Sequence, residues 1–314
     1  MVGVALISAI IAVLAGWPGS HQYLGFTVLC RASWGMRGGF WPVLNRIVTA
    51  VVWLGIQMYR GGQAMKIILG ALVGEKWVAL RDTLPESANV DTASLIAFFL
   101  FLVIFLPCFM VAPERLQMPF RVTFVMITCT MFGILGWAIA TNNGPGTLLH
   151  TPPTAKGPAL SWAALYGLQS IIGSQASGCL GQSDWTRYAK TPNAALAGQL
   201  VMAPIAICVT VVCALLITSA TAEIYGVYLW SPFELLHIQQ TCLTPVSRAG
   251  TFFAGLGFLC SQLALCMVLN CVSAGMDLAA LCPKYIKIRR CGYFVSVVAI
   301  AICPWTSAVL LALP

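Results

Sequence analysis

Residues 92–112 read TASLIAFFLFLVIFLPCFMVA, a stretch without a single charged side chain. About 20 consecutive apolar residues suffice for an α-helix to cross the hydrocarbon core of a bilayer, so this stretch predicts a transmembrane helix. Comparable stretches recur along the chain, and we expect about eight spans in all. They lie near residues 1–16, 41–60, 92–112, 120–140, 160–183, 197–219, 249–282 and 292–313.

The composition of the whole chain agrees with this interpretation. Of the 314 residues, 59% are hydrophobic and only 8% are charged, with a mean hydropathy of +0.88. Soluble domains average about 25% charged residues, so this chain could not cover its surface with polar groups in water. Lipid is the solvent that makes such a composition stable, and an all-α integral membrane protein is the expected fold class.

The segments between the spans are short and rich in Gly, Pro and charge, which predicts turns. Examples are Trp17–Gly19, Asn142–Gly146 and Pro283–Lys284. The sequence Ser231-Pro-Phe-Glu234 resembles a capping box with proline at the first helical position, so we expect a short interfacial helix running to about Gln240. No low-complexity linker divides the chain, which predicts one domain over residues 1–314.

Basic residues are distributed unevenly between alternate loops. Cytoplasmic loops carry an excess of Lys and Arg, so the loops with eleven basic residues are predicted to be cytoplasmic and those with four to lie outside. The net charge of +8 therefore has a topological explanation, and we expect no nucleic-acid partner. The richer set is Arg31, Arg37, Arg46, Arg115, Arg121, Arg187, Lys190, Lys284, Lys287, Arg289 and Arg290, and the poorer set is Lys76, Arg81, Lys156 and Arg248.

Enzyme and metal chemistry find little support in the sequence. The thirteen cysteines lie mostly inside apolar runs without a CxxC pair, and the histidines at 21, 150 and 237 are far apart. Packing of small side chains explains these cysteines better than disulfides or metal ligation. The acidic residues are isolated near span ends, so no convergent catalytic group is expected, and neither a metal nor a cofactor.

Several polar side chains are predicted near the middle of the bilayer. Trp53 and Gln57 share one helix face, Ser174 and Gln175 lie in a span rich in small and polar residues, and Asn270 is roughly central in its span. Such groups are costly in hydrocarbon unless they face partners or a cavity. Two explanations remain open: a midplane substrate site beside a broken helix in the 160–183 span, or close helix packing with interhelical hydrogen bonds.

Three segments resemble the class-one nucleobase–cation symporters, in particular the fungal branch that carries uracil, allantoin, uridine and related compounds. The first is HQYLGFTVLCRASWG at 21–35, which leads into PVLNR at 42–46 and WLGIQ at 53–57. The second is QSDWTRYA at 182–189, and the third is NCVSAGMD at 270–277, which continues into PKYIKIRR at 283–290. These segments occur in the expected order over nearly the whole chain.

The resemblance implies a leucine-transporter-like architecture, in which the first ten of twelve helices form two inverted repeats of five. On that template the eight spans match the second to ninth helices. The chain would then be truncated at both ends, and we expect it not to transport by itself. The family's aromatic and amide on its third helix fall on Trp53 and Gln57, and its asparagine on the eighth helix falls on Asn270.

The implied function is secondary active transport of a nucleobase-like compound across, by default, the plasma membrane. A flat heterocycle would stack on Trp53, and its ring amides would pair with Gln57 and Asn270. Gln175 stands where bacterial relatives have an aromatic, so a second stacking face is not expected. Thr27 and Gly181 also depart from the residues that the family often has, proline and asparagine.

Coupling to protons rather than to sodium is expected. Sodium-coupled relatives place hydroxyls about one and a half turns before the asparagine, where this chain has Ala264 and Leu265. Asp277, seven residues after Asn270, is either a proton acceptor or gate partner, or a helix-end carboxylate paired with a nearby cation. Two alternatives to a transporter remain, a non-transporting receptor of the same fold and an inactive truncated paralogue. The oligomeric state is left open.

Overall fold

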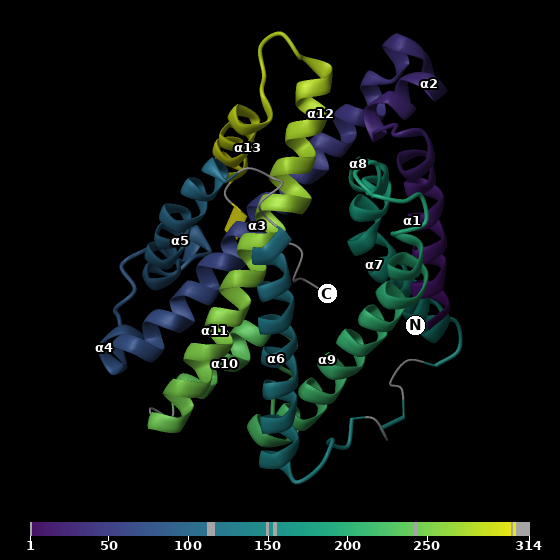
Figure 1. Ribbon diagram of the computed structural model, residues 1–314. Coiled ribbons are helices and arrows are strands. Elements are labelled where there is room, and N and C mark those ends of the chain that lie inside the picture. Colours follow the sequence, from purple (N-terminus) through teal and green to yellow (C-terminus); the bar gives the residue numbers. More distant parts are fainter. Residues whose placement is uncertain are drawn as a thin grey trace. The chain divides into compact units, whose positions relative to one another are not determined.

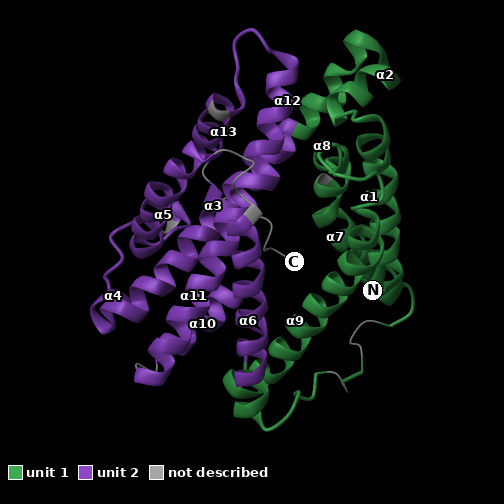
Figure 2. Ribbon diagram, in the orientation of Figure 1, with its two compact units in different colours: residues 1–46, 138–226 green, residues 47–137, 227–314 purple. Residues whose placement is uncertain are grey.

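The computed structural model describes residues 2–111, 117–148, 151–152, 156–241, 244–302 and 304–305. Every regular element in these residues is helical. Arg115 and His150 lie outside the described residues, as do 306–313 of the last expected span. The chain forms two compact units (Figure 2), one of residues 1–46 and 138–226, the other of residues 47–137 and 227–314.

The first unit is built around helix α1 (Figure 1). Its helices are α1 Val2–Gln22, α2 Phe26–Gly38, α7 Pro158–Leu180, α8 Gln182–Thr186 and α9 Ala203–Tyr225, the last preceded by a π-helical turn, η4, at Gly198–Met202. Small side chains recur along one face of α1, at Ala5, Ala9, Ala12, Gly16 and Gly19, all buried. Small residues let helix backbones approach closely in membranes, and α1 packs against α7, α8 and α9.

The closest approach in this unit is between α1 and α8. Thr186 Oγ1 donates a hydrogen bond to the carbonyl of Gly16 at 2.7 Å. A Cβ added at Gly19 would lie 2.5 Å from the carbonyl oxygen of Ser183 and 2.8 Å from its Cα. Since both are backbone atoms, the two helices would have to move apart to admit a side chain.

Replacement of Gly19 by alanine is therefore expected to destabilise the protein by about 1–3 kcal/mol, the usual cost of overpacking a filled core. The measurement is the loss of folded, monodisperse protein on heating in detergent. Gly173→Ala is the matched control, because a Cβ at that glycine of α7 meets nothing within 4 Å. Equal heat resistance of the Gly19 variant and this control would contradict the packing argument.

The second unit is organised around the long helix α3, Phe40–Val73, which begins in the first unit. Around it stand α5 Thr92–Phe105 with the 3₁₀ turn η2 Leu106–Met110, α6 Gln117–Asn142, α10 Pro232–Gln240, α11 Pro245–Leu265 and α13 Ile288–Ala301. A π-helical segment, η5 at Cys266–Val272, joins α11 to α12 Ser273–Leu281. The short helices α4 Glu75–Val78 and η1 Glu86–Ala88 lie between α3 and α5 in the chain.

Glycines bring α3 close to its neighbours in this unit. A Cβ at Gly62 would meet the backbone of Phe98 on α5, and one at Gly255 on α11 would meet Ile67 and Ile68. Leu54 and Met58 of α3 are fully buried. The core of the second unit therefore runs along α3.

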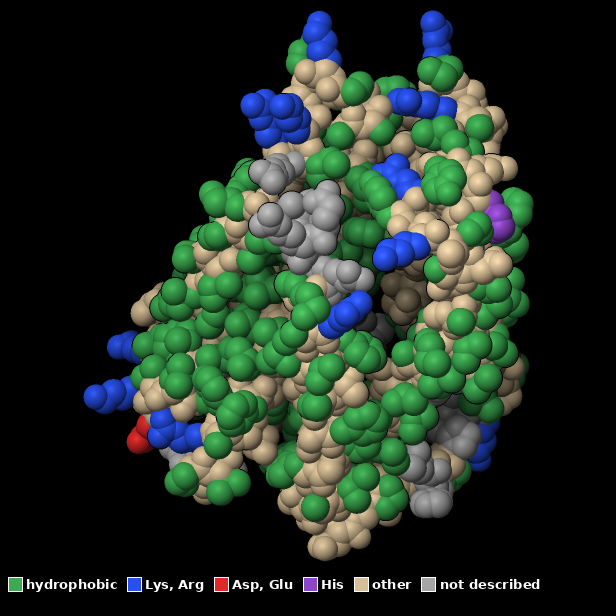
Figure 3. Space-filling model, in the orientation of Figure 1, with side chains coloured by type: hydrophobic (Ala, Val, Ile, Leu, Met, Phe, Trp, Pro, Cys, Tyr) green, Lys and Arg blue, Asp and Glu red, His purple; other side chains and the backbone are tan. Residues whose placement is uncertain are grey.

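Six helical segments of the described chain are long and apolar enough to cross a bilayer: Val2–Gln22, Phe40–Val73, Thr92–Met110, Met118–Asn142, Gly198–Tyr225 and Pro245–Leu281. Each coincides with a span expected from the sequence. The two other expected spans form α7, which is long but more polar, and α13, of which the described part is shorter. Large apolar side chains such as Phe99 and Val103 are exposed, and hydrophobic side chains cover much of the face seen in Figure 3. Lipid would cover such surface.

The structure differs from the sequence-based predictions in three local features. The Trp17–Gly19 turn does not form, because α1 continues through Pro18 to Gln22; packing against α7 and α8 holds the helix where proline removes one backbone bond. Of the two alternatives left open for the 160–183 span, the broken helix is not observed within α7, which is a regular helix to Leu180. Its hydroxyls bond their own backbone, as Ser174 Oγ does with the carbonyl of Ile171 at 2.8 Å.

The third concerns the expected capping box. Helix α10 does begin at Pro232 and end at Gln240, as expected, but Ser231 makes no side-chain capping bond. Its hydroxyl is buried instead, without a hydrogen-bond partner in the described structure. The proline at the first helical position has no N–H to satisfy, and burial of Leu235 and Leu236 holds the helix in place.

Candidate functional site

The polar residues expected at the bilayer centre are divided between the two units. Trp53 and Gln57 lie on α3 and Asn270 lies in η5, all within the second unit. Ser174 and Gln175 belong to the first unit, where their side chains are exposed on α7. Within the second unit, the three residues can be compared directly.

Contacts between α3 and α11 define the register of these helices. Arg248 Nε donates to the carbonyl of Ala71 at 2.9 Å, and seven residues later Gly255 faces Ile67 and Ile68. The two helices are therefore antiparallel. At about 1.5 Å per residue, Asn270 comes roughly level with Trp53, and Gln57 lies about one turn farther toward the α10 end.

The helix around Asn270 is irregular. Asn270 is buried, with 7% of its surface exposed, and it lies in the π-helical segment Cys266–Val272. Its side-chain Nδ2 donates to the carbonyl of Leu265 at 3.4 Å. Single π-helical turns inside α-helices occur frequently at functional sites, because they displace the backbone ladder and redirect side chains. An irregular helix was one of two alternatives for the 160–183 span, whereas the structure has the irregular segment here.

Gln262 is a polar residue that the sequence argument missed. It is buried on α11, and its Oε1 has no hydrogen-bond partner in the described structure. Two turns separate it from Asn270, so both lie on one helix face, and the register brings it about one turn beyond the level of Gln57. An isolated glutamine in an apolar run, eight residues before Asn270, was the available signal. A buried acceptor without a partner is costly unless a ligand or water satisfies it.

Asp277 is buried, with 1% exposed, on α12 one turn before that helix ends at Leu281. It lies in the same unit as Asn270, and α12 packs against α13 and η5. A carboxylate that is almost completely buried is expensive to ionise. Whether it serves coupling, gating or helix-end pairing is a question of function rather than of fold.

A buried ion pair connects three segments of the first unit. Arg46 Nη2, on α3, lies 2.9 Å from Asp184 Oδ2 on α8, and each side chain is 4% exposed. The backbone N–H of Phe26 donates to Asp184 Oδ1 at 3.0 Å. Because Gly25 offers no side-chain cap to α2, the carboxylate supplies that cap. The Arg46 guanidinium also lies 4.4 Å from the centre of the Phe26 ring.

The sequence argument quoted all three of these segments but did not pair their charges. HQYLGF ends at Phe26, PVLNR ends at Arg46, and Asp184 is the third residue of QSDWTR. The structure brings the three together at one carboxylate. The first two of the segments that carry the resemblance thus share a structural role, the joining of α2, α3 and α8.

Long apolar helices with buried amides and carboxylates between them define an integral membrane protein of the polytopic α-helical class. The sequence profile described as "Permease for cytosine/purines, uracil, thiamine, allantoin" matches residues 2–310. The chain belongs to this permease family. The resemblance stated from the sequence motifs is thereby confirmed.

Individual relatives agree with the family assignment. The uracil permease of Saccharomyces cerevisiae is 34% identical over 311 residues, covering 97% of this chain and 48% of the permease. The allantoin permease of the same yeast is 33% identical over 305 residues, covering 95% of this chain and 47% of that protein. The uridine permease of the same yeast is 29% identical over 301 residues, covering 95% of this chain and 47% of that permease. The chain spans about half the length of the curated relatives it matches. No solved structure matches the chain.

Proposed function

We propose that this chain forms the substrate-binding part of a proton-coupled permease for uracil, allantoin, uridine or a related compound in the plasma membrane. The observation that carries the proposal is the match to the permease family over residues 2–310. Relatives that match the chain at 33–34% identity are permeases for uracil and allantoin.

In the proposed site, Trp53 stacks on one face of the heterocycle, and carboxamides form hydrogen bonds with the polar groups along the edge of the ring. Aromatic stacking suits a flat ring whatever its substituents. A carboxamide both donates and accepts hydrogen bonds, as the ring amides of these compounds require. Gln57 and Asn270 are the proposed partners, and Gln262 is added because its buried Oε1 lacks one. Ser174 and Gln175 of α7 are also proposed as substrate-binding residues.

The inverted five-plus-five repeat of the leucine-transporter-like fold belongs to the same proposal. It would pair α3 with the α11–α12 segment as related third and eighth helices. Support comes from the antiparallel packing of these two helices and from the polar residues that each carries at comparable depth. Alternating exposure of the site to the two sides of the membrane would then follow from movement of one helix group against another.

The test is uptake of radiolabelled uracil by cells that have no uracil permease of their own. Two proteins are compared at equal membrane abundance: the chain itself, and a chimera in which it replaces the matching half of the yeast uracil permease. Unlabelled allantoin, uridine and thiamine serve as competitors. Saturable accumulation that a competitor abolishes supports the proposal. Binding without accumulation by the chimera would indicate a receptor. The absence of both binding and uptake would refute the proposed substrate class.

Proton coupling gives a separate prediction. Uptake by the active protein is expected to rise as the outside medium is acidified and to be unchanged when choline replaces sodium, because Ala264 and Leu265 offer no hydroxyl to a hard cation. Asp277→Asn is expected to flatten the pH dependence, since an amide cannot take up the proton. Glu75→Gln, an exposed acid-to-amide change on α4, is the control. Sodium-dependent uptake would overturn the assignment of the coupling ion.

A further inference from the structure

A small polar cavity lies in the second unit, near the end of α3 that the sequence places outside the cytoplasm. Its volume is about 90 Å³. A single water needs roughly 10–15 Å³ measured in this way, so the cavity can hold several waters or a small hydrated ion. Its walls come from α3, α4, the start of α5 and α10, and consist of Lys66, Trp77, Val78, Leu80, Asp91, Ala93, His237 and Gln240.

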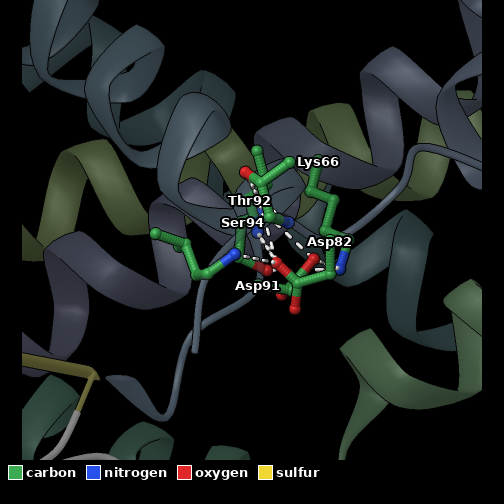
Figure 4. Close-up of polar contacts among 7 residues, drawn as sticks. Lys66, Asp82, Asp91, Thr92 and Ser94 are labelled. Atoms are coloured by element: carbon green, nitrogen blue, oxygen red, sulfur yellow. Dashed lines mark hydrogen bonds and ion pairs between the residues drawn. The ribbon is translucent and has the colours of Figure 1, made fainter. Parts of the chain in front are cut away.

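One wall of the cavity is a fixed ion pair (Figure 4). Lys66 Nζ lies 2.7 Å from Asp91 Oδ2 and donates to Ser94 Oγ at 3.2 Å. Asp91 Oδ2 also accepts from the backbone N–H of Ser94, which caps α5. The neighbouring loop is held by Asp82, whose Oδ1 accepts from the backbone N–H and the hydroxyl of Thr92. These bonds keep Lys66 at the cavity without adding net charge.

The groups at the cavity that still have hydrogen-bonding capacity are mainly donors. Trp77 Nε1 is buried and has no partner in the described structure. An indole nitrogen can only donate, so it requires an acceptor. The Lys66 ammonium has three N–H groups, of which two are used by Asp91 and Ser94. The imidazole of His237 contributes a third N–H donor, whereas Asp91 Oδ2 is already engaged by Lys66 and by the backbone N–H of Ser94.

We propose that this cavity is a binding site for a small inorganic anion, with Trp77, Lys66 and His237 as its donors. A cation is disfavoured because Lys66 already neutralises Asp91 and lies beside it. An apolar molecule is disfavoured because charged and polar side chains dominate the walls. The anion comes from the outside medium, since Glu75–Asp91 belongs to a loop assigned to that side.

Anion binding at this site is linked to protonation of His237. Burial lowers the pKa of His237 and the charge of Lys66 lowers it further, with Asp91 opposing, so the imidazole is neutral in a neutral medium. Of the other charged side chains nearby, Glu75 and Lys76 on α4 and Glu234 on α10 are exposed, and Arg60 on α3 is half-buried and pairs with Gln63. A bound anion favours the protonated imidazole, so by linkage acid must tighten anion binding.

The experiment measures chloride binding to the purified full chain in detergent, by ³⁵Cl line broadening and by the thermal unfolding midpoint. Sodium chloride is titrated against sodium gluconate at constant ionic strength, at pH 5.5 and pH 7.5. A ligand that binds only the folded state raises the midpoint with its concentration. We expect the half-saturating chloride concentration to be at least about fivefold lower at pH 5.5, within the usual range of linked sites.

Two variants separate the contributions to this site. Trp77→Phe keeps the ring but removes the N–H, and it is expected to abolish the chloride effect by both measurements. Trp162→Phe, an exposed indole on α7, is the matched control and should keep it. His237→Gln should bind chloride with equal affinity at the two pH values. Identical curves in chloride and gluconate for the unmodified chain, or full chloride binding by Trp77→Phe, would overturn the proposal. Neither measurement involves uptake, so the outcome is independent of the proposed transport function.

Discussion

Replacement of Asp184 by asparagine is expected to destabilise the folded protein by about 3–5 kcal/mol, the usual cost of removing one partner of a buried ion pair. The carboxylate accepts from Arg46 and from the backbone N–H of Phe26, and it is almost fully buried. Asparagine keeps the shape but leaves the guanidinium without its counter-charge in a site of low dielectric. The cost is larger than for any exposed pair, which is worth less than about 1 kcal/mol.

The measurement is resistance of the detergent-solubilised protein to heat and to denaturant, with Glu75→Gln as an exposed acid-to-amide control. The double variant Arg46→Met with Asp184→Leu provides a sharper test. Replacing both charges by apolar groups of similar volume is often neutral or stabilising, so it should recover much of the lost stability. If Asp184→Asn matched the control, the pair would not hold α2, α3 and α8 together.

Loss of the Gln57 carboxamide is expected to weaken substrate affinity by about 1–3 kcal/mol, or roughly 5- to 150-fold, because a ligand amide would remain buried without a partner. This prediction rests on the proposed function. The measurement is the concentration of uracil that half-saturates uptake or binding, compared between Gln57→Ala and the unmodified protein at equal membrane abundance. Gln63→Ala is the control on the same helix, since that side chain pairs with Arg60 instead.

A double-mutant cycle with Asn270→Ala tests whether the two amides contact one ligand. Residues that act on the same molecule couple by about 0.5–3 kcal/mol, whereas independent sites add. Additive losses would place the two amides at separate positions. Unchanged affinity in Gln57→Ala would remove that residue from the site altogether.

The apolar runs along the chain were sufficient to predict the spans. In hydrocarbon, a helix of about 20 residues spans the bilayer with its backbone N–H and C=O groups hydrogen-bonded to each other. The run at 92–112 therefore predicted the helix that is observed at Thr92–Met110. Helix boundaries were less predictable. A proline inside a helix usually ends or kinks it. Helix α1 nevertheless continues past Pro18, because α7 and α8 pack along its face.

The candidate site could be predicted only in part. Trp53, Gln57 and Asn270 were found from residue type, depth and family motif, and these are local properties of the sequence. The π-helical turn around Asn270 was not, because the apolar sequence Cys-Met-Val-Leu before it is compatible with a regular helix. Gln262 was overlooked since a single amide in an apolar run acquires meaning only once its burial is known.

The sequence by itself determined that this chain is a polytopic helical membrane protein and which permease family it resembles, and it predicts that the loops rich in Lys and Arg are cytoplasmic. Those properties depend on composition and short motifs, because lipid imposes the same requirement on every segment. Only the tertiary structure decided that Arg46, Asp184 and Phe26 meet, and that Lys66, Trp77 and His237 enclose one cavity. Charges 138 residues apart pair only where packing brings their helices together, and small-residue contacts such as Gly19 against Ser183 set that distance.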